Sequence, residues 1–203
     1  DHGCMYGVID FYKAAKKRGI QPIIGCEVYV AKRGRLDKVH ELDGENRHLV
    51  LLCENETGYR NLAAMVSKAW TEGFYNKPRV DFELLEQYHE GLIALSACLS
   101  GEVPRACCGG TTRGPRRRLN YQRIFGEGNF YLELQDHGLE DEHYVNPNIL
   151  KLARETGIPL VVTNDCHYIR EEDREMHKVL LCIQTGRTVE DRRPWTSARA
   201  SCT

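Results

Sequence analysis

The sequence predicts an α/β fold in which parallel strands alternate with helices, as a barrel or as a doubly wound sheet. Short β-branched, apolar runs alternate with segments whose apolar residues recur at helical spacing. Neither G-x-G-x-x-G nor G-x-x-x-x-G-K-[ST] occurs, so a nucleotide-binding sheet loses support and the barrel is favoured. In both folds, functional side chains gather at the carboxyl ends of the strands.

The amino-terminal half predicts helices and strands in alternation. Apolar residues at helical spacing indicate a helix over residues 8–18, which Gly19 would end. Strand patterns cover residues 22–30, 48–53 and 91–98, and a polar loop separates the first two. Asn55 or Thr57 is placed to cap the helix that follows the second strand, and Asp81 a short helix to Tyr88.

The carboxyl-terminal half continues the alternation. Residues 129–134 and the run Leu160-Val161-Val162 predict two further strands, the second of them buried. Asn146-Pro147 has the form of an N-cap and first helical residue, and Gly157 would close that helix. A last helix is indicated through Met176, Val179, Leu180 and Ile183, ending at Gly186.

Two stretches, residues 105–122 and 189–203, lack this periodic pattern. The first contains Gly109, Gly110, Gly114 and Pro115, which should interrupt any helix, and an arginine run over 116–118. The arginines could form a phosphate-binding patch, but a solvated or disordered segment is favoured. Translation out of frame is a third explanation of the lost pattern. The tail 189–203 is expected to be disordered.

The composition fits a soluble domain with a packed core. Of 203 residues, 41% are hydrophobic and 28% charged, and the net charge of −1 gives no global basic field that calls for nucleic acid. No apolar run reaches the length of a membrane span, and no signal peptide is present. The nine cysteines form no C-x-x-C pair, which favours reduced thiols in the cytoplasm. The opening Asp1-His2-Gly3 reads as the middle of a motif, so we expect a longer parent protein.

Asp165 and His167 are the first candidates for chemistry. They follow the strand 160–162, and residues two apart in an extended segment point to the same side, where they could hold a divalent metal. A strand-to-loop turn explains them equally well. Glu27 lies inside an apolar strand, and a buried carboxylate needs a cation; a metal is favoured over an internal ion pair or a water-facing edge.

Other metal-ligating residue types fall near strand ends. His2 follows an expected strand end. His48 opens a strand, where a histidine is more often structural than a metal ligand. Cys98 ends a strand; its thiolate could bind zinc, but most single buried cysteines are inert packing. His137 follows a strand as a ligand, a substrate contact or a turn residue. This repetition predicts a multi-metal centre that activates water against a phosphoester. No Ser-His-Asp set offers an equally simple alternative.

Ordered motifs then resemble a known family, the PHP (polymerase and histidinol phosphatase) domain of the bacterial replicative polymerase, DNA polymerase III subunit alpha. The matching segments are Asp1-His2-Gly3, Pro22-Ile23-Ile24-Gly25-Cys26-Glu27, His48-Leu49-Val50-Leu51-Leu52, Gly91-Leu92-Ile93-Ala94-Leu95-Ser96-Ala97-Cys98, Glu133-Leu134-Gln135-Asp136-His137-Gly138 and Thr163-Asn164-Asp165. The resemblance implies a PHP domain over residues 1–188, built as a distorted (β/α)7 barrel. It is incomplete at the amino terminus, where the family's first His-x-His motif is absent, and 105–122 is anomalous within it.

The resemblance also implies the site. Its metal ligands would be His2, Glu27, His48, Cys98, Asp165 and His167. Asp1, His137 and Asn164 would hold the ligands in position or contact the substrate, with Asp1 orienting His2. Up to three zinc or manganese ions would occupy the complete domain.

The function implied is that of a DNA polymerase III subunit alpha in bacterial replication, a nucleotidyltransferase whose PHP domain removes 3′ nucleotides as a 3′–5′ exonuclease. One alternative is a non-catalytic PHP scaffold that stabilises the polymerase and docks a separate proofreading exonuclease subunit. Another is a free-standing PHP phosphatase. The expected partners are DNA and the other holoenzyme subunits, with no membrane.

Overall fold

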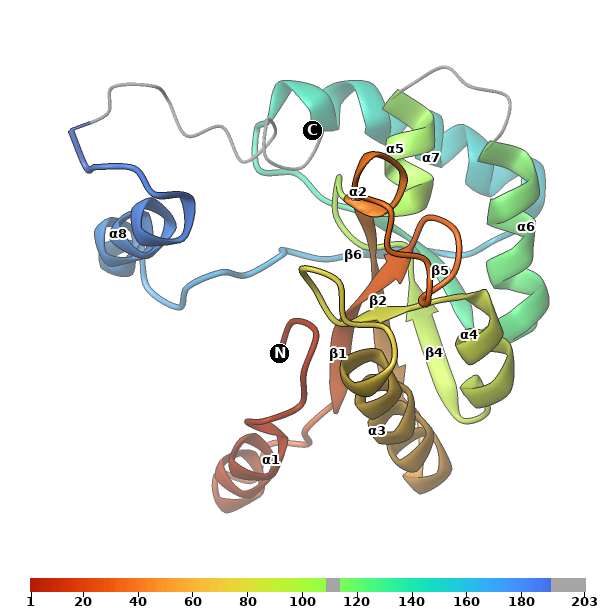
Figure 1. The fold of residues 1–203 in the computed structure, drawn as a ribbon, viewed down its shortest axis with the longest axis horizontal. Coiled ribbons are helices and arrows are strands. Elements are labelled where there is room, and N and C mark those ends of the chain that lie inside the picture. The colour runs from red at the N-terminus through yellow and green to blue at the C-terminus, as the bar shows by residue number, and fades with distance from the viewer. Residues whose placement is uncertain (109–113, 191–203) are drawn as a thin grey trace.

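A six-stranded sheet organises the computed structural model of the chain, which describes residues 1–108 and 114–190, with the backbone alone for 114–119. The strands lie in the order β3-β1-β2-β4-β5-β6. Their bounds are Gly25–Ala31 (β1), Asn46–Cys53 (β2), Arg79–Val80 (β3), Leu92–Leu95 (β4), Phe130–Leu134 (β5) and Leu160–Val162 (β6). Figure 1 shows the sheet at the centre of the molecule, with helices on both of its sides.

The predicted α/β class and its barrel-like arrangement are confirmed, but the described sheet is open, with β3 and β6 at its edges. The sequence predicted parallel strands, whereas the described sheet is mixed. Among the described strands, β2 alone runs against the others, because it pairs antiparallel with both β1 and β4. The segment between β1 and β2 holds only the one-turn helix α2 (His40–Asp43), which does not form the helical crossover that a parallel connection uses.

The helices begin and end largely at the predicted signals. Their bounds are Val8–Lys17 (α1), Glu56–Thr71 (α3), Phe82–Tyr88 (α4), Glu102–Cys108 (α5), Gly114–Phe125 (α6), Glu140–Thr156 (α7) and Arg174–Thr185 (α8), with a 3₁₀ turn at Glu171–Asp173. The side chains of Asn55 and Asp81 accept hydrogen bonds from Gly58 N and Leu84 N, as N-caps do. Gly157 and Gly186 adopt left-handed conformations just after α7 and α8.

One face of the sheet forms the hydrophobic core. Alternate strand residues such as Val28, Leu51 and Leu132 point to this face and pack against α3, α4, α6 and α7. The intervening residues, among them Glu27 and Glu133, point to the opposite face. The sequence alternation therefore separates a core side from a side that carries polar, chemically active groups.

The start of α7 differs from the prediction at Asn146-Pro147. The helix begins at Glu140, and Pro147 lies inside it. The carboxylate of Glu142 accepts hydrogen bonds from the amides of His137 and Leu139, which secures the earlier start. The Asn146 side chain donates to the carbonyl of Gln135 instead of capping a helix.

Residues 105–122 are helical wherever the structure describes them, so the expectation of a solvated or disordered segment is wrong there. The chain to Cys108 belongs to α5, and α6 resumes at Gly114 and places Tyr121 in the core at 1% exposure. Pro115 is the second residue of α6, in the first turn, where no intrahelical N–H bond is lost. Residues 109–113, the arginine side chains 116–118 and residues 191–203 of the tail lie outside what is described.

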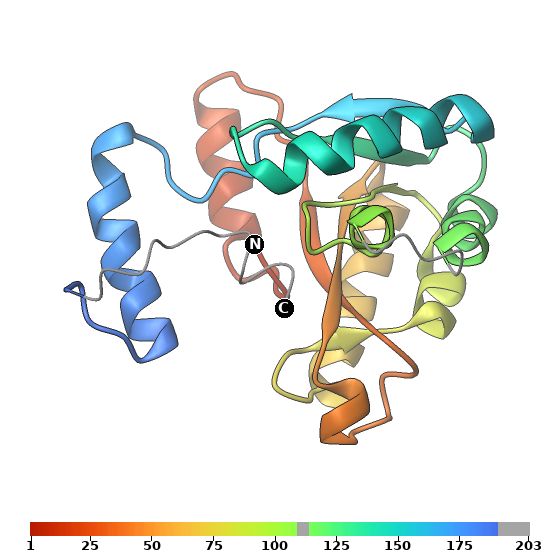
Figure 2. The same ribbon diagram turned by 90° about the horizontal axis from the view of Figure 1, so that it is seen from above.

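The strand β6 is not buried, in contrast to the prediction. Leu160 is 39% and Val162 76% exposed, because β6 is an edge strand that pairs with β5 alone. The helix α8 stands apart from the sheet in both views (Figures 1 and 2), and its Leu180 and Ile183 are exposed. Among the described helices, none has the length and apolarity needed to cross a membrane.

Candidate metal centre

Three of the predicted ligands meet at one point of the sheet. His48 Nδ1 lies 2.7 Å and His2 Nε2 3.8 Å from Glu27 Oε1. The potential ligand atoms of these three residues all lie within 4.8 Å of one another. Two imidazole nitrogens and a carboxylate oxygen at this spacing are a donor set that zinc and manganese accept.

The reversed direction of β2 explains why His48 reaches this point. His48 is near the beginning of β2, and an antiparallel strand begins at the edge where its neighbours β1 and β4 end. The residues that follow β4, including Cys98, therefore lie beside His48. His2 arrives from a segment that runs along β1, with Gly3 N donating to Glu27 O and Glu27 N donating to Asp1 O.

Cys98 lies next to the three ligands without being one of the close group. Its Sγ is 3.7 Å from His48 Nδ1 and the residue is half-buried. Burial raises the pKa of the Cys98 thiol to about 12, and the carboxylates of Asp165 and Glu27 act in the same direction. Without a cation the sulfur therefore carries its proton at neutral pH, and a bound metal would remove it.

Asp165 and His167 line the same cavity as His2, Glu27 and Cys98, and its volume is about 690 Å³. The prediction that Asp165 and His167 point to the same side assumed an extended segment after β6. The segment is not extended, because Asp165 has a positive φ of 44°. His167 Nδ1 instead bonds the backbone oxygen of Asp165 at 2.7 Å, which leaves its Nε2 as the ligand atom. The structure brings both residues to the cavity, outside the group of three.

The electrostatics of the cavity favour a cation. Burial lowers the pKa of His2 to about 4, so its imidazole is neutral and can offer a lone pair. Burial would raise the pKa of Glu27, but the hydrogen bond from His48 and the nearby imidazoles more than offset it, and the pKa lies below the usual value. Burial raises the pKa of Asp165 and Glu27 adds to that effect, while His167 and His137 act against it. Two carboxylates and a neutral imidazole that line one cavity thus offer ligand atoms to a cation.

The three predicted supporting residues have distinct environments. The Asp1 carboxylate accepts a hydrogen bond from the Gly7 amide at 2.9 Å, and its predicted contact with His2 remains a prediction. His137 Nδ1 bonds Glu142 Oε1 at 2.6 Å, and its Nε2 bonds the backbone oxygen of Asn164 at 2.7 Å. Two acceptors require two ring protons, and Glu142 accordingly raises the pKa of His137. His137 thus ties the end of β5 to the residue that precedes Asp165.

Glu133 is a cavity residue that the sequence reasoning missed. It is 4% exposed in β5, lines the cavity, and its Oε2 has no hydrogen-bond partner among the described residues. The only available signal was a glutamate within an apolar strand, the same signal that singled out Glu27. Tyr29 was also missed; its ring stacks on His2 at 4.4 Å between centroids.

A divalent metal fits these residues. They offer nitrogen, oxygen and sulfur donors: the imidazoles of His2 and His48, the Glu27 carboxylate, the nearby Cys98 sulfur and an unpaired buried oxygen of Glu133. His2, Glu27 and His48 would hold the first ion, and Asp165 and His167 offer further ligand atoms from across the cavity.

Comparison with known proteins gives consistent matches. The family model described as PHP domain matches residues 1–137. The chain is 48% identical over 193 residues to the DNA polymerase III subunit alpha of Treponema pallidum (strain Nichols), covering 94% of this chain and 16% of that protein. It is 44% identical over 198 residues to the DNA polymerase III subunit alpha of Thermus aquaticus, covering 96% of this chain and 16% of that protein. The chain thus spans about one sixth of the length of these curated relatives.

Proposed function

The chain belongs to the PHP domain family, and from this premise we propose that it is the PHP domain of a DNA polymerase III subunit alpha that hydrolyses phosphodiester bonds at DNA 3′ ends. The parent protein would be a replicative DNA polymerase of the bacterial cytoplasm, bound to DNA and to the other holoenzyme subunits, including a proofreading exonuclease subunit. The observation that carries the proposed chemistry is the convergence of His2, Glu27 and His48 at one point.

Each residue of the centre has a separate task in this proposal. His2, neutral because it is buried, offers Nε2 to a metal, while Glu27 offers Oε1 and accepts from His48. His167 keeps its Nε2 available because its Nδ1 is bonded to Asp165 O. When bound, divalent ions activate a water molecule and neutralise the phosphate oxygens that gain charge. His137 holds the loop that carries Asp165 through the Asn164 carbonyl.

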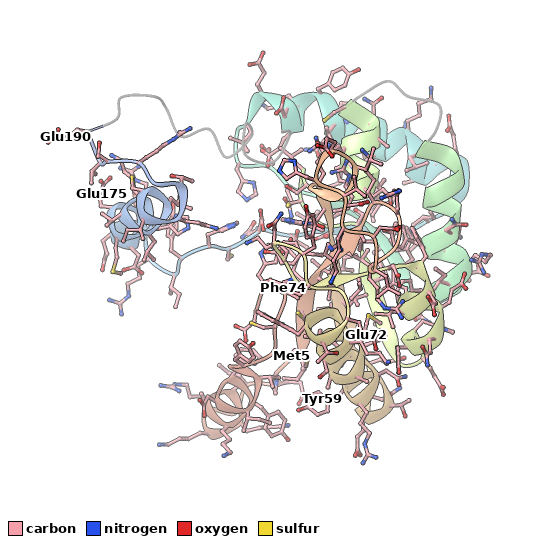
Figure 3. All side chains as sticks on the ribbon, viewed as in Figure 1. Met5, Tyr59, Glu72, Phe74, Glu175 and Glu190 are labelled. Atoms are coloured by element: carbon pink, nitrogen blue, oxygen red, sulfur yellow. The ribbon has the colours of Figure 1, made fainter. Side chains whose placement is uncertain are left out.

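Exposed aromatic side chains beside the cavity support a nucleic acid substrate over a small phosphate ester. Trp70 donates from Nε1 to Gly3 O at 2.8 Å, directly after His2, and stacks on Phe74 at 5.5 Å. The Tyr6 ring lies 6.2 Å from Trp70 and is 80% exposed. Figure 3 labels Met5, which lines the cavity, and Phe74 on neighbouring loops. Aromatic faces of this kind stack on unpaired bases.

A cation accompanies these aromatic residues. Lys77 Nζ lies 5.4 Å from the Tyr29 ring, and the Lys77 charge contributes to the lowered pKa of His2, which places it near the centre. Lys77 forms no ion pair within the described part of the chain, so its charge is available to a phosphate group. Bases on the aromatic rings and a phosphate near Lys77 would lead a 3′ end to the cavity.

A non-catalytic scaffold is the second candidate, favoured by the exposed apolar residues Phe11 and Tyr12 on α1 and Leu180 and Ile183 on α8. Surfaces of this kind are typical of contacts with other protein segments. Metal-dependent hydrolysis distinguishes the two candidates, because a non-catalytic scaffold would leave DNA intact.

The test is release of 3′ nucleotides from 5′-labelled single-stranded DNA in the presence of Mn²⁺ or Zn²⁺. We expect cleavage by the wild type, loss of cleavage with chelator, and loss in an Asp165→Asn, His167→Ala double variant that retains its circular dichroism spectrum. An unrelated exposed change, Glu127→Gln, is the control. A wild type that binds metal and leaves DNA intact, while hydrolysing a small aryl phosphate, would favour a phosphatase instead.

A further inference from the structure

Glu133 combines near-complete burial with an unpaired oxygen at the edge of the candidate metal centre. Its Oε1 accepts a hydrogen bond from Thr163 Oγ1 at 2.7 Å, whereas its Oε2 has no partner among the residues that the structure describes. Burying a carboxylate oxygen without a partner is costly, and such groups in native proteins usually have a protein, water or ion partner. The unpaired oxygen therefore calls for an occupant in the cavity.

The position of Glu133 in β5 directs it to the cavity. Phe130 and Leu132 are buried in the hydrophobic core, and Glu133, one residue further along, points to the other face of the sheet. There it lines the cavity together with Cys98 and Asp165. The backbone fixes this direction, since Glu133 pairs with Val161 of β6 and its amide donates to Ser96 Oγ at 2.8 Å.

The charges around Glu133 argue against an internal ion pair. Burial raises its pKa and the carboxylates of Glu27 and Asp165 raise it further; the Thr163 hydroxyl and the backbone of Ala97 act in the opposite direction without offsetting this effect. No lysine or arginine of the described chain forms an ion pair with Glu133. A neutral carboxylic acid would still need an acceptor for its proton, which Oε2 lacks.

We propose that Glu133 is a further metal ligand, supplying Oε2 to a divalent cation that it shares with Asp165 on the β5–β6 side of the cavity. The inference rests on the proposed function, because it adds a ligand to that centre beyond the six that the family resemblance implies. A position built on two carboxylates is rich in hard oxygen donors, so it should suit Mn²⁺ better than the histidine-rich position at His2 and His48 does.

The test compares Mn²⁺ binding to the full 203-residue chain and to its Glu133→Gln variant, by electron paramagnetic resonance of free Mn²⁺ and by thermal unfolding. Glutamine keeps the shape and an acceptor for Thr163 but removes the anionic oxygen. We expect one Mn²⁺ equivalent to bind more weakly by at least the ~10–100-fold that outer-shell partners typically cost. The metal-free variant should unfold at the same temperature as the wild type or higher, because an unpaired buried carboxylate has been removed.

Control variants separate the outcomes. Glu127→Gln makes the same charge change at the other end of β5, on the surface, and should leave Mn²⁺ affinity unchanged. If Glu133→Gln fails to fold by circular dichroism, Glu133→Asp, which keeps the charge but withdraws it by one methylene, should show the same loss of Mn²⁺ affinity. Mn²⁺ binding by a folded Glu133 variant with wild-type stoichiometry and affinity overturns this inference and leaves the proposed function intact. A wild type that binds no metal refutes the proposed function as well.

Discussion

The tie between His137 and Glu142 gives the sharpest test of how the structure holds Asp165 in place. Replacing Glu142 by Gln removes a carboxylate with 3% side-chain exposure that accepts from the His137 ring at 2.6 Å and from the His137 amide at 2.7 Å. The substituted glutamine retains a single acceptor oxygen, and its NH₂ group would face a donor. We therefore expect a loss of stability together with a looser Asn164 carbonyl, which His137 Nε2 holds at 2.7 Å.

The magnitude follows from the charge of the ring. Hydrogen bonds to charged groups are worth about 1.5–3 kcal/mol, and the partial exposure of His137 places the loss near the lower end, about 1.5–2 kcal/mol. Because the pKa of His137 is raised in the folded state, this stabilisation is complete below the unfolded pKa of about 6.5 and is lost as pH rises through the folded pKa. The difference between wild type and variant should thus be larger in acid than in base.

The assay is urea unfolding of the metal-free wild type and Glu142→Gln at about pH 5.5, below the unfolded pKa of histidine, and at about pH 9. We expect a smaller free-energy difference at the higher pH, because the His137 charge is lost there while the two amide hydrogen bonds to Glu142 still distinguish wild type from variant. An equal difference at both pH values would refute the charged state assigned to His137. Glu127→Gln, on the surface, should show no difference at either pH.

Three further changes test other parts of the structure. Trp70→Ala should weaken single-stranded DNA binding by about 1–3 kcal/mol, the contribution of one base–aromatic stack, in fluorescence anisotropy with chelator present. Tyr144→Ala, an exposed change, is its control, and a Trp70→Ala variant with wild-type affinity would contradict the stacking role. Arg79→Met should lower the free energy of unfolding by about 3–5 kcal/mol, because the fully buried guanidinium donates to the carbonyls of Gly73, Arg35 and Asp37; a urea titration that shows less than about 1 kcal/mol would contradict this. Gly58→Ala should cost roughly 3 kcal/mol in the same titration, because its Cβ would lie 1.8 Å from Gly91 O; wild-type stability would show that α3 can shift away from the start of β4.

Local signals in the sequence predicted the position of most elements. The apolar run around Glu27 predicted the strand that carries it, and short polar side chains predicted the caps at Asn55 and Asp81. These features depend on a few neighbouring residues, which a single sequence displays directly. The approach of His48 to Glu27 also followed from the family resemblance, although its physical cause did not.

The remaining features depend on contacts between distant residues. The reversal of β2 is set by which strands it pairs with, and an apolar run carries no mark of direction. The exposure of Val162 follows from the edge position of β6, and the start of α7 from the bond between Glu142 and His137. The burial of Glu133 follows from the place of β5 between β4 and β6, which the run of residues around it does not reveal.

The edge position of β6 also bears on how long the candidate site stays assembled. Glu27 and His48 lie on β1 and β2, which have neighbouring strands on both sides, whereas Asp165 follows an edge strand with three paired residues and largely exposed side chains. Segments with few buried contacts open at the lowest free energy, so the amide of Val161 should exchange with solvent far sooner than that of Leu51. Two halves of one site thus differ in lifetime, and a ligand that bridges the cavity would slow exchange on the β6 half alone.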